Sequence, residues 1–289
     1  MFAHLKSLQA DFACSMILPK WLAPASAVSF CAACALIQSP AERTHAIATE
    51  KGFLSVAMPD NRLRAFAKPA AKGGSRRVTI YVESDGAPWV APDQPPQDPT
   101  PLKPLVLQMA GADPSNAVAY LGRPCQYLGA ADLARCDPAL WMKARFSEDA
   151  VTAMDQSVEQ LKRFYSASEV NLVGYSGGGA MAALIAARRS DVSCLVTIAA
   201  PLDTKAWTTA IGVSPLSLSL NPADFAEKLK NVRQTHFRGG KDRLVPPAST
   251  RGFLSRLPNA SVIDKESFDH ACCWGDDWQA LLRASCLAQ

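Results

Sequence analysis

The spacing of hydrophobic residues divides the chain into short apolar runs and segments with a helical period. In one segment the apolar positions recur at steps of three and four residues, which is the pattern of one buried helix face: Val151, Met154, Val158, Leu161 and Tyr165. Ser147 stands where an N-cap would satisfy the first free amides of this helix. The pattern therefore predicts an amphipathic helix that begins directly after Ser147.

Short β-rich runs alternate with helical segments along the rest of the chain. Strands are predicted at residues 77–82, 105–109, 170–173, 195–198, 235–238 and 262–263, and the lead-in holds two shorter runs near 53–54 and 63–66. Helices are predicted at 180–187, 222–230 and 276–287, whereas residues 111–146 read as irregular. Strands that alternate with helices predict an α/β fold with a mostly parallel sheet and helices on both faces.

Composition narrows the class of protein. The 289 residues are 48% hydrophobic and 19% charged, which excludes a disordered chain, a coiled coil and a multi-span membrane protein. The formal net charge is +4, and lysine and arginine form no run longer than two residues. A nucleic-acid partner is therefore not expected, because it usually requires a denser basic surface. A chain of this length fits one large domain.

The N-terminal segment has the character of an export leader. Residues 21–41 carry no charge and are rich in alanine, serine and cysteine, so a spanning helix there would be weak. Small residues immediately before Cys34 resemble a bacterial lipobox, in which this thiol would be lipidated; an uncleaved anchor and a simple cleaved signal are the alternatives. We expect residues 1–40 to be the leader or anchor and residues 41–289 the folded domain. The expected location is the bacterial cell envelope, lipid-anchored to the membrane or periplasmic.

Six cysteines remain once the leader and Cys34 are set aside. Cys125 and Cys136 lie in a turn-rich segment and are predicted to form a disulfide, while the other pairings stay open. Cys194, inside an apolar run, is interpreted as a small buried hydrophobe. Cys272 and Cys273 are adjacent and lack the two-residue gap of a zinc site. No metal is expected.

The strongest chemical signal is the pattern Gly-x-Ser-x-Gly at residues 174–178. It falls between a predicted strand and a predicted helix, which is the context of a nucleophile elbow. Ser176 is therefore the predicted nucleophile. The backbone amide of Gly177, at the start of the helix, is the first predicted donor to an oxyanion.

A serine nucleophile requires a base and an orienting acid, and α/β-hydrolases carry them in the order Ser, Asp, His. Asp242 lies in a glycine-containing turn after an apolar run, and His270 follows the last predicted strand. We interpret them as acid and base. Asp203, after the preceding strand, is the alternative acid.

The second oxyanion donor is expected in the loop after the strand at residues 77–82. A backbone amide of Gly86 or Ala87 is the predicted donor. Asp85 poses a difficulty, because a carboxylate beside a forming oxyanion would repel it. We expect its side chain to point away.

With these motifs in order, residues 78–287 resemble the α/β-hydrolase superfamily. The resemblance extends to a group of exported, often lipoprotein-like bacterial hydrolases through the blocks at 81–86, 123–125, 174–179 and 270–274. It implies a serine hydrolase that cleaves a carboxylic ester or related acyl bond of a small molecule or lipid, without a metal or organic cofactor. Residues 201–231 are a possible small cap over the acyl pocket. A non-catalytic envelope binding or assembly protein that retains the fold is the alternative.

Overall fold

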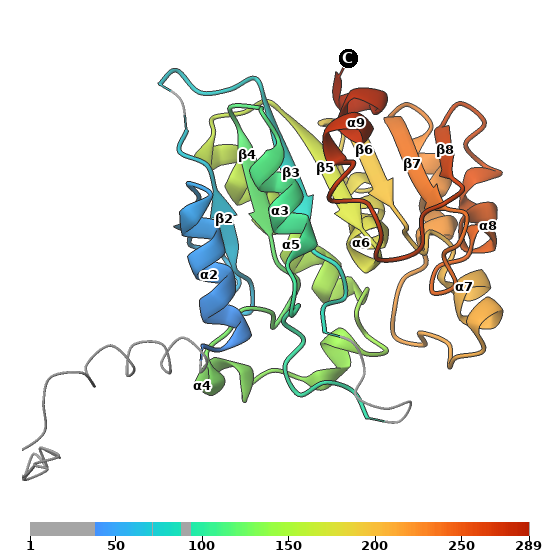
Figure 1. The fold of residues 1–289 in the computed structure, drawn as a ribbon, viewed down its shortest axis with the longest axis horizontal. Helices are drawn as coiled ribbons and strands as arrows, with labels where there is room; N and C mark the ends of the chain where they lie inside the picture. The colour runs from blue at the N-terminus through green and yellow to red at the C-terminus, as the bar shows by residue number, and fades with distance from the viewer. Residues whose placement is uncertain (1–37, 71, 88–93, 289) are drawn as a thin grey trace, which may run out of the picture. The chain divides into compact units, whose positions relative to one another are not determined.

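A computed structural model describes residues 38–70, 72–87 and 94–288, and the compact unit within it runs from Ser39 to Gln289. This unit contains an eight-stranded sheet in the order β1-β2-β4-β3-β5-β6-β7-β8 (Figure 1). The strands from β4 to β8 in this order are parallel, whereas β1 and β2 are antiparallel at one edge. Their bounds are Leu54–Val56 (β1), Ala65–Ala67 (β2), Arg77–Val82 (β3), Val118–Leu121 (β4), Glu169–Tyr175 (β5), Val192–Ile198 (β6), Arg233–Gly239 (β7) and Ser261–Lys265 (β8).

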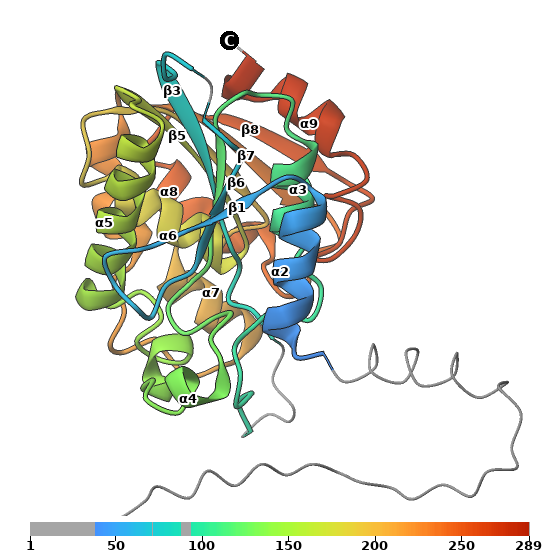
Figure 2. The ribbon, with the colours of Figure 1, turned by 90° about the vertical axis from the view of Figure 1, so that its left-hand side faces the viewer.

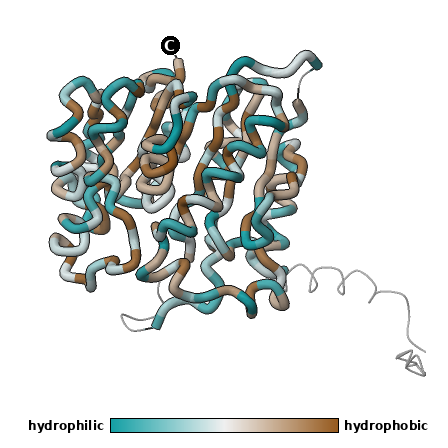
Figure 3. The backbone as a smooth tube through the Cα atoms, turned by 180° about the vertical axis from the view of Figure 1, so that it is seen from behind, coloured by the Kyte–Doolittle hydropathy of each residue, from teal (hydrophilic) through white to brown (hydrophobic). Residues whose placement is uncertain are grey.

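Helices cover both faces of the sheet, as the alternation of elements predicted. Figure 2 shows α5 (Glu148–Phe164), α6 (Gly177–Ala186) and α8 (Arg251–Leu254) on one side and α2 (Pro40–Glu50), α3 (Leu105–Ala112) and α9 (Trp278–Ala284) on the other. Two separate groups of buried apolar residues fill the layers between sheet and helices. Figure 3 shows hydrophobic residues along the central strands and hydrophilic stretches in the outer turns. The mostly parallel α/β architecture is therefore the predicted one.

Six short elements complete the described part of the chain: α4 (Ala130–Leu133), α7 (Thr204–Ile211), and the 3₁₀ helices η2 (Pro138–Trp141), η3 (Pro222–Leu229), η4 (Pro247–Thr250) and η5 (Cys286–Ala288). The segment considered as a cap, 201–231, contains α7 and η3. In the part of the chain that the structure describes, we find no helix with the length and apolarity needed to cross a membrane.

The helix predicted after Ser147 is α5, and its cap has the expected geometry. The Ser147 side chain accepts a hydrogen bond from the Ala150 amide, and Glu148 and Asp149 occupy the first turn. These acidic groups are favourable there because the N-terminal end of a helix carries partial positive charge.

The strand predicted at residues 105–109 is wrong, because this segment forms α3. Its buried positions Val106, Leu107, Met109 and Ala110 follow a helical spacing. A short apolar run is compatible with either a strand or a buried helix, and only three-dimensional packing decides between them. The strand that the sheet requires comes later, as β4 within the stretch predicted to be irregular.

The helix α2 was not predicted in the alanine-rich lead-in. A capping box begins it: the Glu42 amide donates to the Ser39 hydroxyl, and the Glu42 carboxylate accepts from the Ser39 amide. Pro40 occupies the first helical position, where its missing N–H costs nothing.

All six cysteines in the described part of the chain are paired in disulfides. Cys125 is joined to Cys136, the pair proposed from the sequence, and Cys272 to Cys273. The interpretation of Cys194 as a simple buried hydrophobe is wrong, because it is bonded to Cys286 across 92 residues. Burial alone does not distinguish a paired cysteine from a free one, and a partner so distant leaves no local sequence signal.

Candidate active site

Ser176 lies at the sharp turn between β5 and α6. Its backbone angles are φ 54° and ψ −127°, a conformation that is rare for a residue with a side chain. The Ser176 amide donates a 2.8 Å hydrogen bond to the carbonyl of Ile198 at the end of β6. The turn is thus held by the neighbouring strand, at the carboxyl edge of the parallel sheet where ligand sites of such folds form.

Two glycines allow this turn to pack closely. A Cβ atom on Gly174 would come 2.2 Å from the carbonyl oxygen of Gly178, and one on Gly178 would come 2.3 Å from that of Val82. Both contacts are with backbone atoms, which do not move aside as a flexible side chain does. The glycines of the sequence motif are therefore required by the packing of β5, α6 and β3.

His270 lies against Ser176. Its Nε2 is 3.0 Å from the Ser176 Oγ, and its side chain is 17% exposed. The Tyr175 hydroxyl donates a 2.5 Å hydrogen bond to the His270 carbonyl, and the buried Trp274 ring donates to the same oxygen at 3.1 Å. These two contacts fix the backbone that carries the imidazole. Sequence reasoning did not assign either of them, although Tyr175 precedes the serine and Trp274 follows the histidine by four residues.

Asp242 supplies the carboxylate on the other side of the imidazole. Its Oδ2 is 2.8 Å from His270 Nδ1, and its side chain is fully buried. The Oδ1 atom accepts the amides of Leu244 at 2.9 Å and Val245 at 2.7 Å, so the turn after β7 fixes the direction of the carboxylate. The structure thus brings Ser176, His270 and Asp242 into one hydrogen-bonded row.

Asp203, the alternative acid, has a different place. It is the N-cap of α7: its Oδ1 accepts the Ala206 amide at 3.2 Å and the Asn221 side-chain amide at 3.3 Å. These are the contacts of a helix-capping residue. His270 bonds to Asp242 and not to Asp203.

The amides of Gly86 and Ala87 are directed elsewhere than the sequence predicted. The Gly86 amide donates to the Ser84 hydroxyl at 3.3 Å, and the Ala87 amide donates to the carbonyl of Pro99 at 3.1 Å. Gly86 has φ 95°, which explains why a glycine stands there. Both amides are already used to close the loop after β3, so neither is free to bind an oxyanion in this structure.

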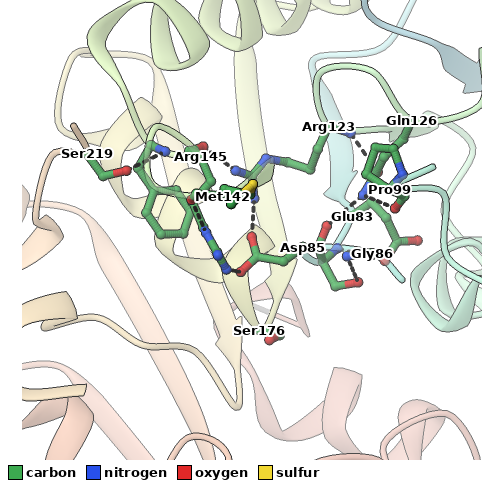
Figure 4. Close-up of polar contacts among 12 residues, drawn as sticks. Glu83, Asp85, Gly86, Pro99, Arg123, Gln126, Met142, Arg145, Ser176 and Ser219 are labelled. Atoms are coloured by element: carbon green, nitrogen blue, oxygen red, sulfur yellow. Dashed lines mark hydrogen bonds and ion pairs between the residues drawn. The ribbon is translucent and has the colours of Figure 1, made fainter. Parts of the chain in front are cut away.

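Asp85, in the same loop, lies against the start of α6. A Cβ atom on Gly177 would come 2.0 Å from the Asp85 Oδ1. The Asp85 carboxylate accepts from Arg145 Nη1 at 2.7 Å and from Arg123 Nη1 at 3.3 Å (Figure 4). Burial alone would raise the pKa of Asp85, but the charges of Arg145 and Arg123 outweigh burial and hold it below its ordinary value. The expectation that the Asp85 side chain points away from the oxyanion donors is therefore wrong: the carboxylate lies beside Gly177, and two arginines pair with it.

Glu83 anchors the end of β3. It is 1% exposed and accepts a 2.6 Å hydrogen bond from the Tyr120 hydroxyl. Its other oxygen accepts the Ser84 amide at 2.7 Å. Burial raises the pKa of Glu83, which favours its neutral form. No sequence signal identified this buried carboxyl group.

A pocket of about 410 Å³ lies beside the loop that carries His270, but it is not the site itself. Its lining includes Leu105, Gln108 and the Cys272–Cys273 pair, and none of Ser176, Asp242 and His270. Among the described residues we find no group of three or more histidine, cysteine or acidic side chains placed to hold a metal ion.

About half of the chain matches the model of a known protein family. A family model described as serine hydrolase (FSH1) matches residues 121–271, a range that contains Ser176, Asp242 and His270. None of the curated proteins compared with the chain matches it significantly.

Solved structures with the same fold include several hydrolases. The putative dienelactone hydrolase of Klebsiella pneumoniae is 17% identical, with a TM-score of 0.56, and the match covers 82% of this chain and 98% of that one. Est1E of Butyrivibrio proteoclasticus is 13% identical, with a TM-score of 0.54 and coverage of 81% and 95%. The Pyrococcus horikoshii acylaminoacyl peptidase is 12% identical, with a TM-score of 0.54; 76% of this chain matches 37% of that longer one. At these identities the likeness establishes the α/β-hydrolase fold.

Proposed function

Because this chain belongs to the serine hydrolase (FSH1) family, we propose that it cleaves a carboxylic ester or related acyl bond with Ser176 as nucleophile, His270 as base and Asp242 as acid. The observation that carries the proposal is the row of contacts from Ser176 Oγ to His270 Nε2 at 3.0 Å and from His270 Nδ1 to Asp242 at 2.8 Å. The positive φ of Ser176 adds to it, because a strained turn exposes the nucleophile.

The geometry supports a two-step acyl transfer. His270 Nε2 accepts the proton of the Ser176 hydroxyl while the oxygen attacks the carbonyl carbon, and the imidazolium then protonates the leaving alcohol. Water attacks the acyl-enzyme in the second step, with His270 again accepting a proton. Asp242 holds the tautomer in which Nδ1 carries the hydrogen, and it stabilises the imidazolium. The buried position of Asp242 strengthens this interaction.

We propose that the oxyanion is bound by the backbone amides of Gly177 and Asp85. Gly177 is the first residue of α6, where helix amides have no intrahelical acceptor. The Asp85 amide donates to no acceptor in the described part of the chain, in contrast to the amides of Gly86 and Ala87. Each such donor contributes roughly 3–4 kcal/mol to the transition state.

The substrate proposed is an ester of a small molecule or lipid. Structures of a Pyrococcus furiosus esterase and a putative dienelactone hydrolase share the fold, and this likeness supports the proposal without fixing the acyl group. A fluorophosphonate probe tests the nucleophile, and p-nitrophenyl esters of graded chain length test the acyl preference. We expect labelling and ester hydrolysis in the wild type and neither in Ser176→Ala. A wild type that is inert to both would refute the proposal and favour a non-catalytic binding protein.

Export to the cell envelope is a further part of the proposal. The disulfide pairing of all six described cysteines supports it, because such bonds persist in oxidising compartments. Cys34, the residue proposed to be lipidated, lies outside the described residues. Incorporation of labelled palmitate into the wild type, and its loss in Cys34→Ala, is the expected result; a wild type that never takes up the label would exclude the lipid anchor.

A further inference from the structure

The Asp85 carboxylate lies where an isolated negative charge would slow the proposed reaction. It contacts Gly177, whose amide is one proposed oxyanion donor, and the amide of Asp85 itself is the other. Negative charge develops on the substrate carbonyl oxygen in the transition state, so a free carboxylate at this position would oppose it.

Two buried arginines hold this carboxylate. Each of its oxygens pairs with a different guanidinium: Oδ2 with Arg145 at 2.7 Å and Oδ1 with Arg123 at 3.3 Å. The Arg145 and Arg123 side chains are 11% and 4% exposed, so water screens these pairs weakly. Figure 4 shows the carboxylate between the two guanidinium groups, with Ser176 nearby.

The arginines are themselves fixed by contacts that do not involve Asp85. Arg145 Nε donates to the carbonyl of Met142 at 2.7 Å, and Arg123 Nη2 donates to the carbonyl of Arg145. The Arg123 guanidinium also lies 5.0 Å from the ring centre of Phe146. The segments after β4 and before α5 thus position Arg123 and Arg145 independently of Asp85, and the Asp85 carboxylate pairs with them.

Two guanidinium groups face the single carboxylate of Asp85, so its charge is fully compensated. Glu83, the other carboxyl group nearby, is buried and takes its hydrogen bonds from Tyr120 and Tyr127. Arginine stays protonated in proteins, so the compensation of Asp85 does not depend on a titrating base.

We propose that Arg145 and Arg123 act as positioning residues of the hydrolase: they fix the loop after β3 through Asp85 and cancel its charge beside the oxyanion. The inference rests on the proposed function. Because the oxyanion exists only in the transition state, loss of the compensation lowers kcat and leaves KM nearly unchanged. A merely structural pairing would lower stability without this division between the two constants.

The decisive experiment is a double-mutant cycle on the hydrolysis of a p-nitrophenyl ester. Arg145→Gln leaves Asp85 under-compensated, and we expect kcat to fall about 100-fold, the size of effect seen when one oxyanion contact is lost. Asp85→Asn removes both the charge and its pairing and is expected to cost about tenfold, because only the fixing of the loop is lost. The double variant Asp85→Asn/Arg145→Gln is expected to be about tenfold faster than Arg145→Gln alone, since the uncompensated charge is gone.

Two further variants separate charge from general destabilisation. Arg145→Lys keeps the positive charge and is expected to retain most of the activity that Arg145→Gln loses. Arg189→Gln is the matched control: this arginine is 9% exposed and pairs with Asp155, Glu159 and Asp191 beyond the other end of α6. We expect it to lower the thermal midpoint and leave kcat unchanged.

The outcomes are separable. A double variant no faster than Arg145→Gln, an unchanged kcat in Arg145→Gln, or an equal loss in Arg189→Gln would overturn the charge compensation while the wild type remains an esterase. A wild type that neither hydrolyses esters nor reacts with the fluorophosphonate would remove the proposed function, and this inference with it.

Discussion

Strand β7 and the loop after β8 place two histidines in opposite surroundings. His236, inside β7, is 1% exposed, with Nδ1 2.8 Å from the Thr197 hydroxyl and Nε2 3.2 Å from the Gln234 side-chain oxygen. His270, in the loop after β8, lies between a carboxylate and a serine hydroxyl. The residue type is the same, but the hydrogen-bonding partners of one ring are neutral, whereas the other ring lies between the proposed acid and the proposed nucleophile.

The difference shows that the partners of a histidine decide its role. Burial, and to a lesser extent the charge of Arg238, lowers the pKa of His236 to about 3, so this ring stays neutral within the core. His270 lies next to the Asp242 carboxylate, which would stabilise the positive charge of the proposed proton acceptor. We therefore expect changes at β7's interior to alter stability, and changes in the turns to alter activity.

The largest effect is expected at Ser176 and His270. Either change to alanine should lower kcat by about 10⁴- to 10⁶-fold, and the double variant should be little slower, because the residues act as a unit. Both side chains lie at the edge of the core, so thermal stability should change little. Steady-state kinetics and thermal unfolding are the measurements. Losses that multiply in the double variant would argue against joint action.

The next effect is expected at Asp242. Asp242→Asn should lower kcat by about 10³- to 10⁴-fold, because the amide no longer favours the tautomer with hydrogen on Nδ1. The remaining side-chain oxygen still accepts the amides of Leu244 and Val245, so the fold should persist. Kinetics compared with circular dichroism test this. Loss of the folded signal together with activity would assign Asp242 to structure rather than to catalysis.

Acid should destabilise the protein through His236. The unfolded chain takes up a proton on this residue near its ordinary pKa of about 6.5, whereas the folded ring does so only near 3. The stability it contributes is complete above about pH 6.5 and falls by up to about 1.4 kcal/mol per pH unit as the pH drops toward 3. Urea unfolding at several pH values measures this slope. His236→Gln should flatten it; equal slopes in the wild type and His236→Gln would contradict the assignment.

The smallest effect is expected at Asp203. Asp203→Ala removes the N-cap of α7 and should lower the free energy of unfolding by about 1 kcal/mol, with activity retained. Denaturant unfolding and ester hydrolysis measure the two quantities. Full activity in Asp242→Asn combined with its loss in Asp203→Ala would reverse the roles of the two acids.

The sequence predicts the fold where local pattern and packing agree. The periodicity after Ser147 gives α5, and the strands β3, β5, β6 and β7 lie where apolar runs predicted them. The strand prediction at residues 105–109 is wrong because a short apolar run can be buried equally well as a strand or as a helix. The segment forms α3, and the place in the sheet is taken by β4.

The candidate site also has a part that the sequence predicts and a part that it does not. Ser176, Asp242 and His270 follow from a motif and an order along the chain. The pairing of Asp85 with two arginines is not predictable from the sequence. Arg123 opens the block at 123–125, but nothing in that block shows that its partner lies 38 residues away, and Arg145, 60 residues from Asp85, lies in no recognisable motif. Likewise, no pattern shows that the Gly86 and Ala87 amides are occupied, since their acceptors depend on how the loop closes.

The disulfide between Cys194 and Cys286 has a practical consequence for preparing the protein. It closes a covalent ring that contains Asp203, Asp242 and His270 but leaves Ser176 outside. A ring of this size is worth about 4–5 kcal/mol in the chain-entropy description. Reducing agents in a purification buffer, or synthesis in a reducing cytoplasm, would therefore destabilise the domain through the segment that carries the proposed acid and base. Preparations of low activity would then reflect the oxidation state of the sample, and titration of free thiols should accompany every measurement of turnover.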